Sequence, residues 1–440
     1  MRRKRRLLLG TLLVLLLMLA ACGGGESTQA PATEEQTESS ATSEQPQATA
    51  TSPTEEQTEA ESGEGTPYKI GFVAAITGPG ASLGVPERNT AEMIAAELEA
   101  AGGIEGPDGV KHPVEIIILD SESNPDKAAA AASRLIDEEQ VDVLVAGTLS
   151  GNSLAMVPLA SEAKVPMISM AAATSIIVDP ETGETRPWIF KTPQTNGHSA
   201  RWQAEYLQAK GITKVCYLYE NSGFGQDTLN QGTAAFESVG IEIVYADTFE
   251  RSDTEFPQVV SVQGSGCEAV VIGSIPPGAS LVQQAIKDAM PDMLVLQGHG
   301  VCNQTYIDLA PEAVEGTFVP CSKIIVADQL PEDTPERPVI LKYIESYSAY
   351  TGEAPNAFGG YAHDALRWAI EALGSIEEGH TLAERRAAVR EYIETNIRNW
   401  PGVTGVFTIT PEDHLGLDYT ALAPTKIENS AFKYFPKDAW

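Results

Sequence analysis

Residues 68–84 read YKIGFVAAITGPGASLG, and this stretch decides the fold class. Its apolar first half is typical of a buried strand, a glycine-rich turn follows, and an alanine-rich helical segment covers residues 87–101. Further apolar runs at 113–119, 141–145 and 166–170 alternate with helical stretches. Continuous apolar strands that alternate with helices predict a parallel sheet with helices on both faces.

The strand–helix pattern starts again after a crossover segment at residues 188–192. The 373 residues from 68 to 440 exceed the size at which a single core stops growing, so two lobes are expected. Ligands bind outside the carboxyl ends of parallel strands, which here would line a cleft between the lobes. Strands of the second sheet are predicted at 214–219, 241–245, 269–273, 293–296 and 316–320. Long helices at 335–350, 356–373 and 382–399 precede a short strand pair near 402–410.

The N-terminus carries an export pattern. Residues 2–6 are basic, residues 7–19 are uncharged, and Leu-Ala-Ala-Cys follows at 19–22. The quartet resembles the lipobox of bacterial lipoproteins, so we expect a signal peptide at 1–21 and a lipid on Cys22. An ordinary signal peptide or a short membrane anchor is the alternative. Residues 23–66 hold mainly Glu, Gln, Ser, Thr, Ala and Pro, which predicts that 22–66 form the lipidated Cys and a disordered tether.

The charge balance is strongly acidic, with 61 acidic and 29 basic residues and a net charge of −32. This excess argues against nucleic acid as a partner and against direct binding to an anionic membrane surface.

Four cysteines follow Cys22, and an even number in an exported chain predicts disulfides. Three pairings are possible. We favour Cys216–Cys267 with Cys302–Cys321, because the second pair brackets one short loop-and-strand unit. No Cys-x-x-Cys or zinc spacing occurs, so no metal is expected.

One group of residues suggests an enzyme. The glycine loop at 78–84, Asp120 at a strand end and the Tyr206-x-x-x-Lys210 spacing together resemble a short-chain dehydrogenase. Against this, Ser82 stands where a glycine is usual, and export sends the chain to a compartment where nicotinamide cofactors are scarce. No His-Glu-x-x-His, Gly-x-Ser-x-Gly or P-loop spacing is present. A dehydrogenase-like enzyme is therefore retained only as an alternative.

A series of short motifs resembles branched-chain-amino-acid (Leu/Ile/Val)-type periplasmic binding proteins, the substrate-binding components of ABC importers. Their order and spacing carry the resemblance over nearly all of residues 68–410. The motifs are YKIGF (68–72), TGP (77–79), ASLG (81–84), AAGGI (100–104), VAGT (145–148), VPMIS (165–169), AAT (172–174), FKT (190–192), GFG (223–225), AVEG (313–316), GYAHDA (360–365) and VTG (403–405).

This resemblance implies an α/β type I periplasmic-binding-protein fold, in which two doubly wound parallel-sheet lobes are joined by a three-crossing hinge. We place the crossings near Thr192, Ser322 and Thr404. The first lobe would comprise residues 67–192 and 323–403, and the second lobe residues 193–322 and 404–440.

The resemblance also implies a binding site. A loop and helix start would bind a ligand carboxylate, which suits the donors found there. The loop holding Ala172 and Thr174 would offer a carbonyl and a hydroxyl to a ligand ammonium, Phe224 would pack on the ligand, and Tyr361 would face the hinge. The full set is Ser82, Leu83, Leu149, Ser150, Gly151, Asn152, Ala172, Ala173, Thr174, Phe224, Ile275, His299 and Tyr361.

His299 departs from the pattern, because leucine-type proteins carry a glutamate there that pairs with the ammonium. A neutral imidazole gives no ion pair, and a protonated one would repel an ammonium. A plain aliphatic amino acid is therefore in doubt, whereas a carboxylate, an aromatic acid, an amide or a urea-like solute stays open. Alternatively, His299 points away and Asp364 or another acid substitutes.

We expect a monomeric, lipid-anchored solute-binding protein outside the cytoplasm that closes on a small molecule and serves an ABC permease. No catalysis and no cofactor are expected. A ligand-sensing module for a receptor is the other alternative.

Overall fold

The computed structural model describes residues 65–440. The predicted signal peptide, the lipid on Cys22 and nearly all of the predicted tether lie outside the described residues. Gly65 and Thr66, the last two tether residues, already contact the folded part. The Gly65 N–H donates to the Lys111 carbonyl at 2.8 Å, and the Thr66 hydroxyl donates to Glu378 at 2.6 Å.

The first sheet has five parallel strands in the order β4-β1-β5-β6-β7. The side chains of these strands are almost all buried or half-buried. Other elements must therefore cover both faces of the sheet. Their bounds are Val114–Asp120 (β4), Tyr68–Ala74 (β1), Val143–Ala146 (β5), Met167–Ser169 (β6) and Ile189–Lys191 (β7).

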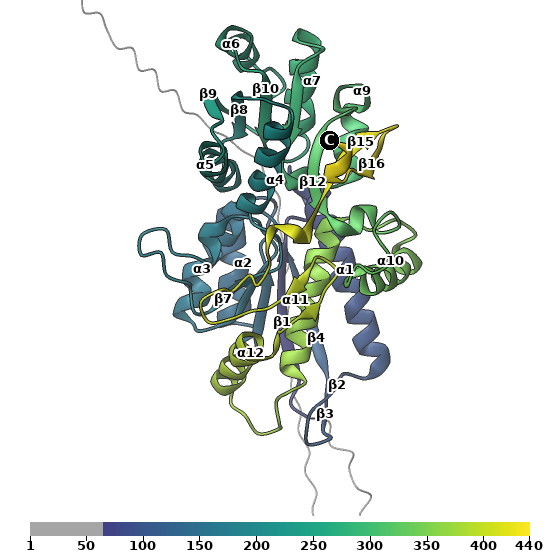
Figure 1. The fold of residues 1–440 in the computed structure, drawn as a ribbon. Coiled ribbons are helices and arrows are strands. Elements are labelled where there is room, and N and C mark those ends of the chain that lie inside the picture. Colours follow the sequence, from purple (N-terminus) through teal and green to yellow (C-terminus); the bar gives the residue numbers. More distant parts are fainter. Residues whose placement is uncertain (1–64) are drawn as a thin grey trace, which may run out of the picture. The chain divides into compact units, whose positions relative to one another are not determined.

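Two groups of helices cover this sheet from opposite faces (Figure 1). On one face α2 packs beside α3, and on the other α1 packs beside α10 and α11, with α12 against α11. Their starts have local causes. For example, the Asn124 side chain caps α2 by accepting from two backbone N–H groups. The helices are Ala81–Ala101 (α1), Pro125–Asp137 (α2), Ser150–Glu162 (α3), Arg337–Thr351 (α10), Ala357–Leu373 (α11) and Leu382–Asn396 (α12).

The second sheet has seven strands in the order β16-β15-β12-β11-β10-β8-β9. Five of them are parallel, as predicted, whereas β15 and β16 add an antiparallel edge that the sequence analysis missed. The bounds are Lys214–Glu220 (β8), Glu242–Phe249 (β9), Ala269–Gly273 (β10), Leu294–Gln297 (β11), Phe318–Ser322 (β12), Leu422–Glu428 (β15) and Ala431–Tyr434 (β16). The main helices of this region are Asn196–Ala209 (α4), Gly223–Glu237 (α5), Gln258–Ser265 (α6) and Gly278–Ala289 (α7).

Both disulfides lie in the second-sheet region. Cys216 is bonded to Cys267 and Cys302 to Cys321, which are the pairs favoured from the sequence. The first bond ties β8 to the segment before β10, and the second ties the segment after β11 to β12.

The chain passes between the two sheets three times. It leaves the first sheet after β7, returns after β12 to form α10, α11 and α12, and finally reaches β15. Thr192 directly follows β7, and Ser322 ends β12. Thr404 precedes the short strand β14 (Val406–Phe407), whose Phe407 packs against Trp368 of α11 with ring centroids 4.8 Å apart. The residues at which one lobe ends and the other begins stay a prediction.

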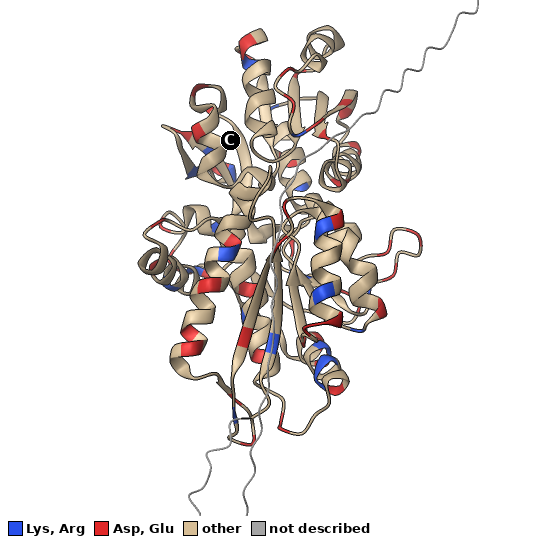
Figure 2. Ribbon diagram, turned by 180° about the vertical axis from the view of Figure 1, so that it is seen from behind, with Lys and Arg blue, Asp and Glu red and all other residues tan. Residues whose placement is uncertain are grey.

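Charged side chains of both signs lie mainly on the helices and loops around the two sheets (Figure 2). Within residues 65–440, none of the helices combines the length and the apolar character needed to cross a membrane.

Candidate functional site

A pocket lies where strands of both sheets end. We call its two sides the first wall and the second wall, after the sheet that supplies each. The first wall consists of Leu83, Thr148, Leu149, Ser150, Met170, Ala171, Ala172, Phe358 and Tyr361. The second wall consists of Glu220, Phe224, Arg251, Ile275, His299 and Gly300. Pro193, on the first passage between the sheets, completes the lining.

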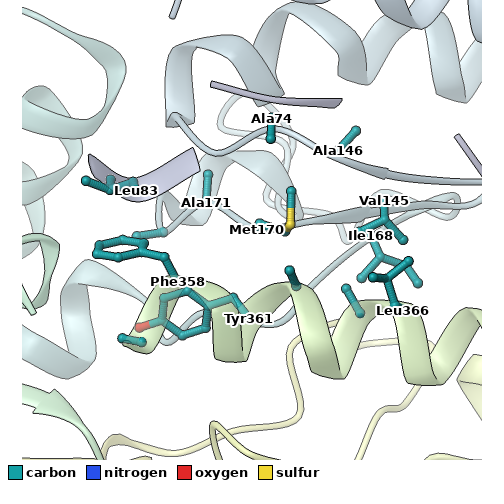
Figure 3. Close-up of a cluster of buried hydrophobic side chains, with 14 of the residues drawn as sticks. Ala74, Leu83, Val145, Ala146, Ile168, Met170, Ala171, Phe358, Tyr361 and Leu366 are labelled. Atoms are coloured by element: carbon teal, nitrogen blue, oxygen red, sulfur yellow. The ribbon is translucent and has the colours of Figure 1, made fainter. Parts of the chain in front are cut away.

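Most of the pocket surface is apolar. Figure 3 shows Phe358 and Tyr361 of α11 facing Leu83, Met170 and Ala171 across the first wall. The same cluster continues inward to buried residues of β5 and β6, so a rigid core supports this wall. An apolar lining with a few polar groups is the usual form of a small-molecule site.

The polar part of the first wall is built at the start of α3. Leu149 is the N-cap residue and provides no side-chain cap, so the first N–H groups of this helix have no side-chain partner among residues 65–440. Ser150 lies in the first turn, and its hydroxyl accepts the Ala173 N–H at 3.3 Å. Free N–H groups, the helix dipole and a hydroxyl together favour an anion.

Glu87 lies behind this wall and is fully buried. Thr148 donates its hydroxyl to the Glu87 carboxyl group, and both side chains are buried. Burial raises the pKa of Glu87 well above its usual range, which outweighs the opposite effect of the Thr148 hydrogen bond. The direction of this shift favours the protonated, uncharged form of Glu87.

A buried lysine supports the loop after β6. The Lys191 amine donates to the carbonyl of Ala172, a pocket residue, and Lys191 is 0% exposed. Burial lowers the pKa of Lys191 to about 7, although the nearby Asp227 carboxylate acts in the opposite direction. Asp227 itself accepts from the Asn196 amide at 2.7 Å and from the Thr174 N–H at 3.4 Å.

Glu220 is the one acidic side chain in the described lining, and it is fully hydrogen-bonded within the second wall. Arg251 donates two hydrogen bonds to its carboxylate, one of them at 3.1 Å. Ser222 and Ser274 donate their hydroxyls at 2.6 and 2.9 Å, and the Ile275 N–H donates at 3.2 Å. Five donors fill the acceptor capacity of a carboxylate.

His299 is the other polar group of the second wall. It is 2% exposed, and neither ring nitrogen has a hydrogen-bond partner among the described residues. Burial, followed by the charges of Lys191 and His198, lowers the pKa of His299 to about 3, although the Gln194 backbone opposes this. His299 is therefore a neutral imidazole, with one ring nitrogen as a donor and the other as an acceptor.

The passages between the sheets meet beside the pocket. The Tyr361 hydroxyl donates to the Gln194 side chain at 3.0 Å, and the Gln194 amide donates to the Thr404 carbonyl at 2.5 Å. Asp364 accepts from the N–H groups of Val403 and Thr404 at 2.8 Å each, and it does not line the pocket. Tyr361 and Asp364 thus connect α11 to the first and third passages.

The structure brings together most of the predicted ligand residues. Gly151 and Asn152 line an adjoining groove instead, and the backbones of Ala173 and Thr174 bond to Ser150 and Asp227. The Ser82 hydroxyl is buried without a hydrogen-bond partner among residues 65–440, and Ser82 is outside the lining. The predicted residues in the lining are Leu83, Leu149, Ser150, Ala172, Phe224, Ile275, His299 and Tyr361.

Several lining residues escaped prediction, above all Glu220 and Arg251. Glu220 directly follows the predicted strand 214–219, so the strand-end rule offered a signal for it. Arg251 lies six residues beyond the predicted strand 241–245, because β9 extends to Phe249. The remaining additions are Thr148, Met170, Ala171, Pro193, Gly300 and Phe358.

The residues that suggested a dehydrogenase have structural roles. Asp120 accepts from the N–H groups of Ile76 and Thr77 and thereby holds the glycine loop. Tyr206 stacks on Phe318 in the second core at 4.2 Å, and burial raises the pKa of its phenol, which is the opposite of activation. Tyr206 and Lys210 are both outside the pocket lining.

Comparisons with known proteins agree with this geometry. A family profile described as "Periplasmic binding protein" matches residues 67–428. The chain is similar to "Leu/Ile/Val-binding protein homolog 3" of Brucella melitensis, with 24% identity over 321 residues, or 72% of this chain and 82% of that protein.

Solved structures share the fold. An extracellular ligand-binding receptor from Rhodopseudomonas palustris HaA2 superposes with a TM-score of 0.75 and 31% identity, over 84% of this chain and 99% of that one. A branched-chain amino acid transporter substrate-binding protein from Streptococcus pneumoniae, in complex with isoleucine, has a TM-score of 0.69 and 20% identity, over 83% of this chain and 98% of that one.

Proposed function

The chain belongs to the periplasmic binding protein family, and from this we propose that it is the extracytoplasmic solute-binding component of an ABC importer. Members of this family are solute-binding proteins that act outside the cytoplasm. The observation that carries the proposal is the pocket, because both sheets supply its walls. The names of the relatives support an amino-acid-like or carboxylate solute.

Binding would close the two walls on the solute. A ligand that contacts both walls binds the closed form more tightly than the open form and so shifts the population toward closure. The hydrogen bonds that join Tyr361, Gln194 and Thr404 lie where two passages meet, which supports a hinge there. The closed form would then dock on the permease as a monomer.

Cys22 would carry the lipid that keeps the protein at the membrane. Stable anchoring requires more than one acyl chain, so we expect a diacylglyceryl group with or without a further N-acyl chain. Mass spectrometry of the N-terminal peptide from the native host tests this, since an unmodified Cys22 would exclude the anchor.

A thermal-shift screen tests the solute-binding function. The purified protein is heated with amino acids, carboxylates, aromatic acids, amides and ureas, and a solute that binds the native state raises the melting temperature. Small-angle X-ray scattering with the best solute should then show a smaller radius of gyration. A screen without any shift contradicts the proposal.

A further inference from the structure

We infer that the solute is an apolar carboxylate that carries no α-ammonium group. This inference rests on the proposed function and concerns the same pocket. The charges and the hydrogen-bonding groups of the two walls favour carboxylates without an ammonium group over amino acids.

The first wall supplies what a carboxylate needs. The uncapped start of α3 offers backbone N–H groups, and Ser150 adds a hydroxyl beside them. Lys191, whose pKa is lowered to about 7, lies behind Ala172, and Arg251 in the lining is already paired with Glu220. Burial raises the pKa of Glu87, which favours its uncharged form behind this wall. The second and independent sign of a ligand is His299, which is buried in the lining with both ring nitrogens unpartnered.

An ammonium finds no free carboxylate in this pocket. Glu220 already accepts five hydrogen bonds, two of them from Arg251. Asp364 is held by Val403 and Thr404 and lies outside the lining. Asp227 accepts from Asn196 and Thr174 and is likewise outside the lining. A buried charge without a partner is costly, so an amino acid would be penalised.

The carbonyl that would hold an ammonium is also engaged. Lys191 donates its amine to the carbonyl of Ala172. A ligand ammonium at that carbonyl would lie beside Lys191. It would either be repelled by the protonated amine or displace the hydrogen bond from Lys191 to Ala172. In effect, the chain provides its own amine at this position.

His299 completes the argument from the second wall. Its neutral ring offers one donor and one acceptor, which suit a carbonyl or hydroxyl oxygen. Such an oxygen on the carbon next to the carboxylate would take the place of the ammonium. Phe224 and Ile275, together with Leu83, Phe358 and Tyr361, would surround an apolar remainder.

Isothermal titration of the full-length protein with matched ligands tests the inference. One set is L-leucine, 4-methyl-2-oxopentanoate and 4-methylpentanoate, and the other is L-phenylalanine, its 2-oxo acid and 3-phenylpropanoate. Within at least one set, the acids should bind at least about 100-fold more tightly than the amino acid. His198→Gln serves as a control, because His198 is half-buried and does not line the pocket. It should keep this preference.

Failure of the inference and failure of the proposed function give different results. If the amino acid binds as tightly as its acids, or more tightly, in both sets, the inference is overturned and solute binding stays intact. If neither these ligands nor any compound of the wider screen binds, both proposals are overturned. Loss of the preference in His198→Gln would show that the preference does not arise from the lining, and that also overturns the inference.

Discussion

The two walls of the pocket face the same space but differ in chemistry. The first wall ends in an uncapped helix start and a serine, both free to meet an anion. The second wall contains the Glu220 carboxylate, which is paired with Arg251, and the His299 imidazole, which burial keeps neutral. The first wall therefore selects a negatively charged solute. The second wall selects the group on the carbon next to the solute's carboxylate.

The largest expected effect on stability comes from removing the ion-pair partner of Glu220 in the second wall. Arg251→Met leaves the Glu220 carboxylate, which is 1% exposed, without its cation. We expect the free energy of unfolding to fall by about 3 kcal/mol, measured by urea denaturation. Lys127→Met removes the exposed Lys127–Glu122 pair and should cost under about 1 kcal/mol. Equal losses in the two variants would mean that Glu220 does not depend on Arg251.

Replacing the imidazole should convert the second wall toward an amino-acid site. His299→Glu places a carboxylate where leucine-type proteins have one. The affinity for L-leucine relative to 4-methyl-2-oxopentanoate should rise about 30-fold, or about 2 kcal/mol, as measured by titration calorimetry. His299→Gln removes the ring without adding charge and should leave the ratio within about threefold. An unchanged ratio in His299→Glu would show that residue 299 does not face the solute.

The neutral state of His299 should also appear in the pH dependence of stability. Its pKa is lowered from 6.5 to about 3. Between these pH values the unfolded chain binds a proton at this imidazole and the folded chain does not. The free energy of unfolding must therefore fall as the pH drops from about 6.5 toward 3, by about 1.4 kcal/mol per pH unit at the steepest. His299→Gln should show a slope flatter by this amount between about pH 4 and 6. Identical slopes in the two proteins would contradict a buried neutral imidazole.

The smallest expected effect tests the first wall. Ser150→Ala removes one hydroxyl from the carboxylate site and should weaken binding of the acid about fivefold, or about 1 kcal/mol. Ser82→Ala is the matched comparison, because Ser82 was predicted in the site but does not line the pocket. Its dissociation constant should change by less than about twofold. The reverse order of effects would place the carboxylate at the start of α1 instead.

The predictable part of the molecule is the part with continuous apolar strands. The runs that became β1, β5, β8 and β10 are mostly buried, and β4, although half-buried, contains the continuous apolar run 116–119, so their pattern identified them. Strand β15 escaped because Pro424 interrupts its pattern, and the edge strand β16 escaped because it has only four residues, of which Lys433 is exposed.

Site residues could be predicted from the sequence only where they lie together on one loop. Ser150 and Leu149 follow one strand, and a single segment reveals them. The Glu220–Arg251 pair joins two strand ends that lie 31 residues apart, and no local pattern shows that these side chains meet. The engagement of the Ala172 carbonyl by Lys191 is likewise a product of the fold, although both residues lie in motifs that the sequence displays.

A crystal structure of the protein with 4-methyl-2-oxopentanoate tests the central claim most directly. The account predicts the carboxylate within hydrogen-bond distance of the Ser150 hydroxyl and the first N–H groups of α3. It also predicts the 2-oxo oxygen at a ring nitrogen of His299 and the alkyl group against Phe224 and Ile275. A carboxylate bound away from α3, or a rearranged Glu220 released from Arg251 to face the ligand, would contradict it.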